Sequence, residues 1–260
     1  MIRSLWIAKT GMEGQQAALD AISNNLANVA TNGYKRGGVS FEDLMYQNLR
    51  PAGSASSEQS QLPTGLQVGL GVKVAASTRN FSQGTLTNTG NALDMAVSGN
   101  GFFQITLPDG STGYTRDGAF QTDGNGQLVT AAGYVLQPGI TIPPGALSVT
   151  VSNDGIVNIT TQGQINPTKI GQIQLASFVN PSGLDPRGGN LFGETAASGS
   201  PNAAAPGSSG HGTLQSGFIE GSNVNVVQEL VTMIATQRAY ELNSKAIQTS
   251  DQMLQRLGQL

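Results

Sequence analysis

Apolar residues at helical spacing occupy both ends of this 260-residue chain, while the ~190 residues between them show the patterns of β structure. The N-terminal segment repeats an apolar residue every seven positions, with a second row three positions later: Leu5, Met12, Leu19 and Leu26, then Ala8, Ile22 and Val29. In the C-terminal segment five residues recur at the same spacing of seven: Val226, Met233, Tyr240, Ile247 and Leu254. Three further apolar residues flank them: Leu230, Met253 and Leu257. Two helices with such stripes must bury them against a partner, so the pattern favours self-assembly over catalysis.

The stripes have two interpretations. A helical hairpin within one chain would bury them, and so would packing between copies of the chain. The C-terminal helix is expected to be the longer of the two. Gly11 and Gly14 each weaken the N-terminal helix by about 1 kcal/mol relative to Ala, while they permit close backbone approach. We therefore expect that this helix orders only against a partner, and the glycines favour packing among several helices.

Local signals predict where each helix begins and ends. The N-terminal helix should stop near Asn32 and Gly33, because Gly33 can take the left-handed conformation that terminates helices. The C-terminal helix has a candidate cap at Asn225, with Gln228 three residues later.

Short stretches of alternating polarity predict strands throughout the middle of the chain. They cover residues 72–76, 93–97, 102–107, 128–136, 147–151, 156–160 and 170–179. Four Asp-Gly pairs, beginning at Asp109, Asp117, Asp123 and Asp154, are typical of hairpin turns. The predicted fold is therefore α+β: paired long terminal helices forming a coiled coil, a central antiparallel β domain, and an extended β arm.

Two further segments lack periodicity. Residues 46–65 are rich in Ser, Gln, Pro and Gly, which predicts a long loop or an extended arm. Residues 195–213 have the composition of a low-complexity linker. Three regions follow: residues 1–32 with 224–260 as a helical core domain, 33–71 with 214–223 as a connecting arm, and 72–213 as an outer β domain.

Composition excludes several classes of function. The net charge is −3, only 11% of the residues are charged and aromatic residues are few, so nucleic acid is an improbable partner. The chain contains no Cys, and no run of residues approaches a membrane span. The first residues carry charges where a cleaved secretory signal peptide would be apolar. We expect a protein without a membrane span or cleaved signal.

Catalytic, metal and cofactor sites are not expected. The single histidine, His211, lies in the predicted linker, where a rigid catalytic base would not be placed. Residues from Asp123 imitate a calcium loop, but its twelfth position is Tyr134 rather than a bidentate Glu. Glu42 and Asp43 are adjacent, so they point apart and cannot flank one scissile bond.

The segment from Ser23 to Arg36, SNNLANVATNGYKR, resembles a signature of the bacterial flagellar rod and hook family. Its candidate signature residues are Asn24, Asn25, Leu26, Ala27, Asn28, Thr31, Gly33, Tyr34 and Lys35. Residues 233–247 resemble the other terminal block of that family, and residues 99–103, 114–120 and 133–136 match its middle. The resemblance therefore covers nearly the whole chain.

Within the family the chain is most similar to subunits of the distal rod. The segment that distinguishes rod from hook is residues 46–63, with Tyr46, Leu49, Pro51, Gln61, Leu62 and Pro63 as candidate arm residues. The resemblance implies a structural subunit that polymerises into a straight, rigid, hollow tube, transmits torque to the hook and forms part of the export channel. Another rod or hook-type axial subunit is the nearest alternative; a cell-wall hydrolase would need an acidic pair or a nucleophile with its base.

The resemblance also implies partners and a location. The expected partners are other copies of the chain, proximal rod subunits below, hook protein above, the rod cap, the surrounding P and L rings, and the type III export apparatus. No cofactor is implied. The rod would span the periplasm as part of the flagellar basal body, after export without a cleaved signal.

Overall fold

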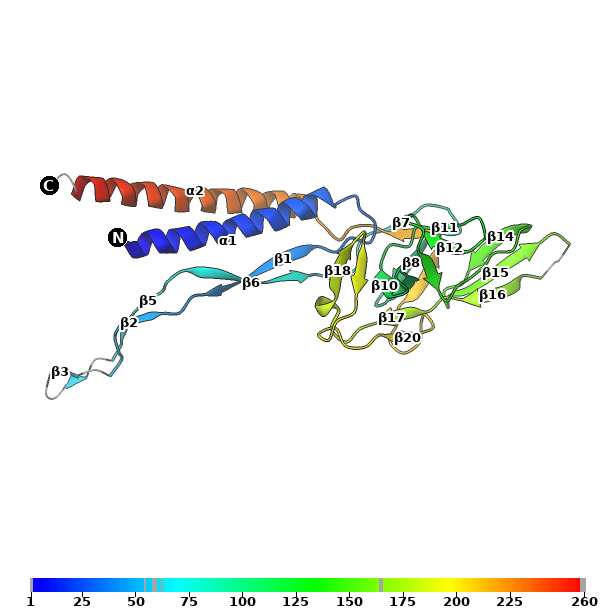
Figure 1. The fold of residues 1–260 in the computed structure, drawn as a ribbon, viewed down its shortest axis with the longest axis horizontal. Helices are drawn as coiled ribbons and strands as arrows, with labels where there is room; N and C mark the ends of the chain where they lie inside the picture. Colours follow the sequence, from blue (N-terminus) through cyan, green and yellow to red (C-terminus); the bar gives the residue numbers. More distant parts are fainter. Residues whose placement is uncertain (1, 54, 58–59, 62, 164–165, 258–260) are drawn as a thin grey trace. The chain divides into compact units, whose positions relative to one another are not determined.

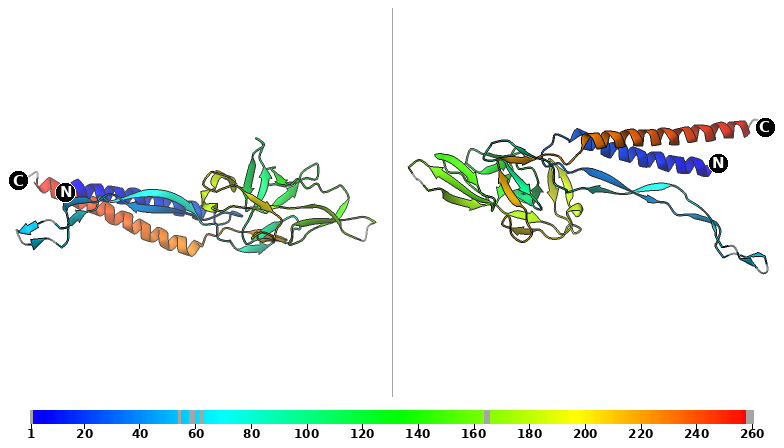
Figure 2. Two further views of the ribbon diagram at one scale, coloured as in Figure 1. Left: turned by 90° about the horizontal axis from the view of Figure 1, so that it is seen from below. Right: turned by 180° about the vertical axis from the view of Figure 1, so that it is seen from behind.

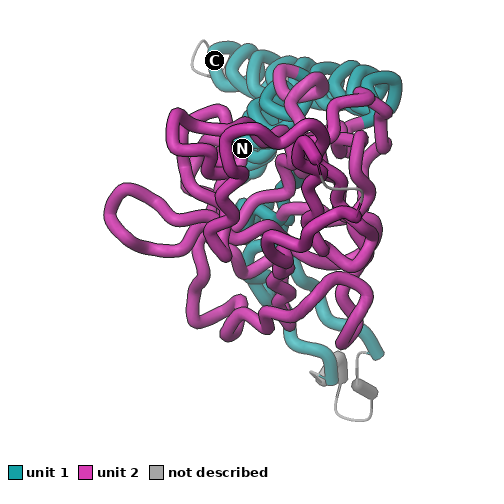
Figure 3. Tube along the Cα trace, turned by 90° about the vertical axis from the view of Figure 1, so that its right-hand side faces the viewer, with its two compact units in different colours: residues 1–26, 37–78, 225–260 teal, residues 27–36, 79–224 magenta. Residues whose placement is uncertain are grey.

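The computed structural model describes residues 2–53, 55–57, 60–61, 63–163 and 166–257 (Figure 1). The chain forms two compact units, coloured separately in Figure 3. Unit 1 comprises Met1–Leu26, Gly37–Thr78 and Asn225–Leu260, and unit 2 comprises Ala27–Arg36 and Arg79–Val224. Each unit is thus assembled from segments far apart in the sequence.

The described part of unit 1 contains two α-helices and three two-stranded ribbons. The helices are α1 (Ile2–Ala27) and α2 (Val226–Leu257). The ribbons pair β1 (Gly37–Asp43) with β6 (Val72–Arg79), β2 (Gln47–Arg50) with β5 (Leu66–Val68), and β3 (Ala55–Ser57) with β4 (Ser60–Gln61). Neither of these two described helices is both long and apolar enough to cross a membrane.

The two glycines within α1 lie against different neighbours. A Cβ on Gly11 would lie 3.0 Å from the side-chain Nδ2 of Asn243 on α2, and a Cβ on Gly14 would lie 3.3 Å from the Phe41 ring of β1. Thr10 Oγ1 also lies 3.4 Å from the Val72 amide nitrogen of β6, which donates to it. Helix α1 therefore contacts both α2 and the β1–β6 ribbon, and only Gly11 serves the helix packing expected from the sequence.

The regular secondary structure of unit 2 is almost entirely strand, joined by turns and loops. The strands are β7 (Leu86–Asn88), β8 (Met95–Ser98), β9 (Phe102–Thr106), β10 (Thr112–Thr115), β11 (Phe120–Thr122), β12 (Leu128–Thr130), β13 (Val135–Gln137), β14 (Ala146–Val151), β15 (Ile156–Thr161), β16 (Thr168–Gln172), β17 (Leu175–Ser177), β18 (Asp185–Gly188), β19 (Leu191–Gly193), β20 (Asn202–Ala204), β21 (Thr213–Ser216) and β22 (Phe218–Glu220). A short 3-10 helix, Pro181–Gly183, follows β17.

The largest sheet of unit 2 has nine strands. Its main path runs β11-β12-β13-β9-β10-β19-β18, with β17 paired to both β9 and β20. A three-stranded sheet, β14-β15-β16, and the pairs β21–β8 and β22–β7 complete the unit. The registers are antiparallel, as the sequence predicts.

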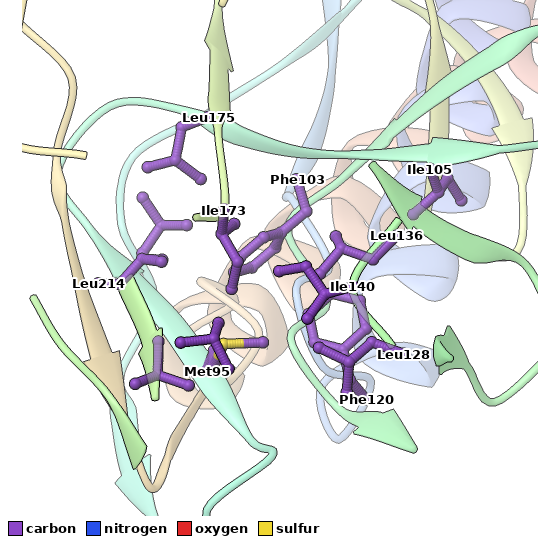
Figure 4. Close-up of a cluster of buried hydrophobic side chains, with 13 residues drawn as sticks. Met95, Phe103, Ile105, Phe120, Leu128, Leu136, Ile140, Ile173, Leu175 and Leu214 are labelled. Atoms are coloured by element: carbon purple, nitrogen blue, oxygen red, sulfur yellow. The ribbon is translucent and has the colours of Figure 1, made fainter. Parts of the chain in front are cut away.

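Strand β9 supplies residues to two apolar clusters. Phe103 and Ile105 belong to a cluster with Met95, Phe120 and Leu136, whose side chains converge in Figure 4. The neighbouring residue, Phe102, packs in a second cluster with Tyr114, Phe178 and Phe192. Because successive side chains of a strand point to opposite faces, β9 is buried on both faces and lies at the centre of unit 2.

The α+β class is confirmed, and several local predictions are corrected. Helix α1 ends at Ala27, five residues earlier than expected, because Thr31 Oγ1 bonds to Asn28 Oδ1 and these side chains form a local turn instead. The predicted strands 128–136 and 170–179 are each two strands. The segment 46–65 contains the paired strands β2, β3 and β4.

Three of the four Asp-Gly pairs do connect antiparallel strands, but the pair at Asp117 does not. It joins β10 to β11, which have other partners, and Gly118 O accepts a hydrogen bond from Met95 N at 2.9 Å. The predicted linker 195–213 is also wrong, since it includes β20. His211 is buried there, with its ring nitrogens 2.9 and 2.8 Å from the carbonyl oxygens of Ser208 and Asn202.

Candidate functional site: the terminal helices and the signature segment

Helices α1 and α2 lie side by side and run in opposite directions within unit 1 (Figures 1 and 2). Asn25 near the end of α1 is almost completely buried. Its Nδ2 donates to Gly37 O at 2.8 Å and to Glu229 Oε2 at 3.3 Å, and its Oδ1 accepts from Gly37 N at 2.8 Å. One signature side chain therefore joins α1, the start of β1 and the first turn of α2.

The candidate packing residues of the N-terminal segment differ in burial. Ile22 is buried, and four others are half-buried: Leu5, Met12, Leu19 and Leu26. Val29 is also half-buried, but it follows the end of α1 and belongs to unit 2.

The candidate packing residues of α2 are largely open to solvent in the single chain. Met233 and Ile247 are half-buried, whereas the exposed members are Val226, Leu230, Tyr240, Met253 and Leu254. The side chain of Leu257 lies outside the described residues. The helix begins as predicted, because Gln228 N donates to the Asn225 side-chain oxygen at 3.2 Å.

The second half of the signature is buried in unit 2. Lys35 Nζ lies 2.7 Å from Glu220 Oε1 and 2.8 Å from the Ser82 carbonyl oxygen. Arg116 approaches the other Glu220 oxygen at 3.3 Å and donates to the Gly99 carbonyl oxygen at 2.7 Å. Two buried cations thus share one buried carboxylate, joining three sequence motifs that lie far apart in the chain.

Burial dominates the electrostatics of this cluster. It lowers the pKa of the Lys35 ammonium, and the attraction of Glu220 opposes that shift. Burial also lowers the pKa of the Arg116 guanidinium, again against Glu220. The arrangement holds charges in place through fixed hydrogen bonds, and it presents no nucleophile with a base.

Gly33 and Tyr34 bring the signature segment close to this cluster. Gly33 has φ +67°, and a Cβ there would lie 2.6 Å from Asp117 N, so only glycine fits. Its amide donates to the Glu220 carbonyl oxygen at 2.7 Å. Tyr34 is buried, and its carbonyl oxygen accepts from Asn223 N at 3.4 Å.

The places where the chain enters and leaves unit 2 are hydrogen-bonded to one another. Asn223 Oδ1 accepts from Arg36 N at 2.7 Å, and its Nδ2 donates to the Asn80 carbonyl oxygen at 2.8 Å. Asn80 N donates to the Arg36 carbonyl oxygen at 2.9 Å. We call these three residues the junction; it holds together, at one point of unit 2, three of the four places where the chain passes between the units.

The candidate arm residues lie in or beside the ribbons of unit 1. Tyr46 and Leu49 are exposed, although the Tyr46 ring lies beside Gly69. Pro51 and Pro63 are exposed. Gln61 belongs to β4, but its side chain and the whole of Leu62 lie outside the described residues.

Sequence reasoning missed Glu220, Glu229 and Asn223. The available signal was indirect: a buried lysine or asparagine in a signature needs a partner, and acidic residues are scarce in this chain. In the described part of the chain, no cluster of three or more His, Asp or Glu side chains is placed to hold a metal ion.

Three family models match separate parts of the chain. They are the flagella basal body rod protein over residues 5–35, the flagellar hook protein FlgE/F/G D1 domain over 96–159, and the flagellar basal body rod FlgEFG protein C-terminal region over 215–260. The matches include the signature segment, the central strands of unit 2 and helix α2.

Full-length relatives carry the same description. The chain is 56% identical over 260 residues to the flagellar basal-body rod protein FlgG of Buchnera aphidicola subsp. Schizaphis graminum, covering 100% of both chains. It is 50% identical to that of Caulobacter vibrioides, covering 100% of this chain and 99% of the relative. The flagellar hook protein FlgE of Helicobacter mustelae matches only 53% of this chain and 30% of its own length, at 46% identity. The chain therefore belongs to the flagellar hook and basal-body rod family, as a structural rod protein and not an enzyme.

Proposed function

We propose that the chain is a subunit of the distal rod, which polymerises into a straight, rigid, hollow tube and transmits torque towards the hook. The observation that carries this proposal is an apolar stripe on α2 that the single chain leaves open. Val227, Val231 and Ile234 are 71%, 63% and 52% exposed, and Leu230 lies beside them. These positions follow i, i+3, i+4 and i+7 spacing, so they form one continuous face.

In the proposed polymer, the terminal helices form the inner layer and pack as coiled coils between subunits. Burial of apolar surface contributes about 25 cal/mol per Å2, so repeated contacts of this stripe supply a large favourable free energy per subunit. The candidate packing residues of both helices take part. Residues 46–63 act as an arm that contacts neighbouring subunits, and the β domain packs laterally.

The location and partners follow the same proposal. The rod spans the periplasm after type III export without a cleaved signal, and the tube continues the export channel. Proximal rod subunits bind below, hook protein binds above, the rod cap acts during growth, and the P and L rings surround the tube. The full-length similarity to rod proteins and the partial match to a hook protein favour the rod over a hook-type role.

Sedimentation of polymer tests the proposed assembly. Ile234→Lys places a charge on the apolar stripe, and we expect it to lower the sedimentable fraction by about tenfold or more, because burial of an unpaired charge is unfavourable. Gln248→Lys is the matched control: it adds the same charge two heptads later on the same side of α2, at an exposed polar position. Equal assembly of Ile234→Lys and the unaltered chain contradicts the proposal.

A further inference from the structure

The contacts between α1 and α2 follow a constant register. Asn25 bonds to Glu229 at 3.3 Å, and Gly11 lies against Asn243. On α1, Asn25 lies fourteen positions after Gly11, and on α2 its partner Glu229 lies fourteen positions before Asn243. Two heptads on α1 therefore match two heptads on α2, as in an antiparallel pair whose facing residues recur every seven positions.

The facing rows consist of small and polar residues. Extending the register by single heptads places Ala18 opposite Thr236 and Ser4 opposite Ser250. We call these eight positions the polar seam: Ser4, Gly11, Ala18 and Asn25 on α1, and Glu229, Thr236, Asn243 and Ser250 on α2. Of these positions, Asn25, Glu229, Thr236 and Ser250 are buried, Gly11, Ala18 and Asn243 are half-buried, and Ser4 near the start of α1 is exposed. Val227, Val231 and Ile234 remain exposed. The apolar heptad row that begins at Val226 lies beside the seam.

Asn25 and Glu229 form the best-determined part of this seam. Each residue is 1% exposed. Gly37 holds the Asn25 amide by two hydrogen bonds of 2.8 Å, which direct its remaining amide hydrogen towards Glu229. Glu229 lies in the first turn of α2, where the helix dipole favours a carboxylate. The Asn25 amide is therefore held by Gly37 on one side and by Glu229 on the other.

A shift of α1 along α2 would separate Asn25 from Glu229. Moving α1 by one heptad carries the Asn25 amide about 10 Å along α2 and away from the buried carboxylate. Apolar contacts alone discriminate poorly between such registers, because they are not directional. A single buried asparagine is known to specify register in helix pairs at a cost in stability.

We infer that Asn25 and Glu229 fix the register of the α1–α2 hairpin, so that the helices of one chain pair through the polar seam and leave the apolar stripe for a second copy. The second part rests on the proposed function; the register itself does not. Asn25 acts here as a positioning residue.

Engineered cysteine pairs report the register directly, since the chain contains no cysteine of its own. Ala18→Cys with Thr236→Cys is the in-register pair, and Ala18→Cys with Asn243→Cys is one heptad away, beyond the ~7 Å limit for Cα atoms bridged by a disulfide. In the dilute full-length chain we expect the first pair to oxidise at least about tenfold faster, because in the inferred register only that pair meets this limit. Denaturing gels separate the internal crosslink from crosslinked dimers.

Substitution of Asn25 or Glu229 should remove the preference for the in-register cysteine pair. Asn25→Leu and Glu229→Leu should each bring the ratio of the two rates to about threefold or less, because apolar packing accepts several registers. Asn24→Leu, at the exposed neighbouring position, and Glu229→Gln, which retains an acceptor oxygen, should keep the original ratio. If Asn25→Leu loses helix content, Glu229→Leu decides the outcome.

Two results overturn the inference: a preference for the shifted pair in the unaltered chain, or an unchanged ratio in both leucine variants. Failure of the proposed function appears separately, as loss of sedimentable polymer in the unaltered chain while the in-register crosslink still forms.

Discussion

The ammonium nitrogen of Lys35 lies 2.7 Å from a carboxylate oxygen of Glu220, and both side chains are fully buried although 185 positions separate them in the sequence. Glu220 also accepts a hydrogen bond from Gly84 N at 2.8 Å and pairs with Arg116. One carboxylate thus organises four segments of unit 2. The consequence is that its charge, more than its volume, should determine the stability of this unit.

Glu220→Gln tests that dependence. The substitution keeps the side-chain volume but leaves two buried cations without their anion, so we expect unit 2 to lose about 3–5 kcal/mol of unfolding free energy. Asp185→Asn, at an exposed position of β18, should change stability by less than about 0.5 kcal/mol. Urea unfolding of the full chain measures both. A similar small effect for the two variants would show that the buried carboxylate charge is unimportant.

Gly33→Ala tests the close approach of the signature segment. The new Cβ would lie 2.6 Å from Asp117 N and 2.7 Å from the Arg116 carbonyl carbon, at φ +67°. Gly110→Ala is the matched control, since Gly110 has φ +79° with no atom within 4 Å of the new Cβ. The control should lose about 1–2 kcal/mol, from the left-handed backbone alone. Gly33→Ala should lose clearly more in thermal unfolding; equal losses would argue against a steric requirement.

Asn223→Ala tests the junction. The variant leaves Arg36 N without the Asn223 oxygen, 2.7 Å away, and removes the donor to the Asn80 carbonyl oxygen. We expect a loss of about 1–3 kcal/mol, the usual effect of an unsatisfied polar group. In hydrogen exchange, the Arg36 amide should also exchange faster. Asn125→Ala, in an exposed turn, is the control. Unaltered protection of Arg36 would contradict the assignment.

Asp117 provides a pH dependence of known sign. Burial raises its pKa above the usual value of 3.8, and the nearby Asp94 adds to the shift. The folded chain therefore binds this proton more tightly than the unfolded chain, so the Asp117 contribution to stability falls as pH rises from 3.8 through the raised folded pKa. Asp117→Asn keeps an oxygen for Ala119 N, which donates to Asp117 at 3.1 Å. The unfolding free energy of the variant should lack that decline with pH. Parallel pH profiles for the variant and the unaltered chain would contradict the contribution assigned to Asp117.

The sequence predicted the elements that depend on local patterns. The seven-residue spacing from Leu5 and from Val226 gave two terminal helices, and Asn225 caps the second as expected. The Asp-Gly turns at Asp109, Asp123 and Asp154 also follow from local backbone preferences. Periodicity failed at the end of α1, where Asn28 and Thr31 bond to each other in a turn.

Partners distant in sequence could not be predicted. Glu229 is a charged residue in the first turn of a helix, which predicts an exposed side chain. It is buried, with a hydrogen bond to Asn25, 204 positions away. His211 lies among Ser and Gly residues that suggest a linker, yet hydrogen bonds to Ser208 and Asn202 fix its ring. At Glu229 a contact distant in sequence outweighs local composition, and at His211 two carbonyl oxygens three and nine positions away do so. The polar seam could not be predicted either, because small and polar residues give no hydrophobic periodicity.

Cryo-electron microscopy of polymer assembled from the full chain would show directly whether α2 packs against neighbouring subunits. We expect a straight tube in which α1 and α2 form the inner layer and neighbouring subunits cover Val227, Val231 and Ile234. A curved tube would favour a hook-type subunit. Terminal helices on the outer surface, with this stripe in solvent, would contradict assembly through the apolar face of α2.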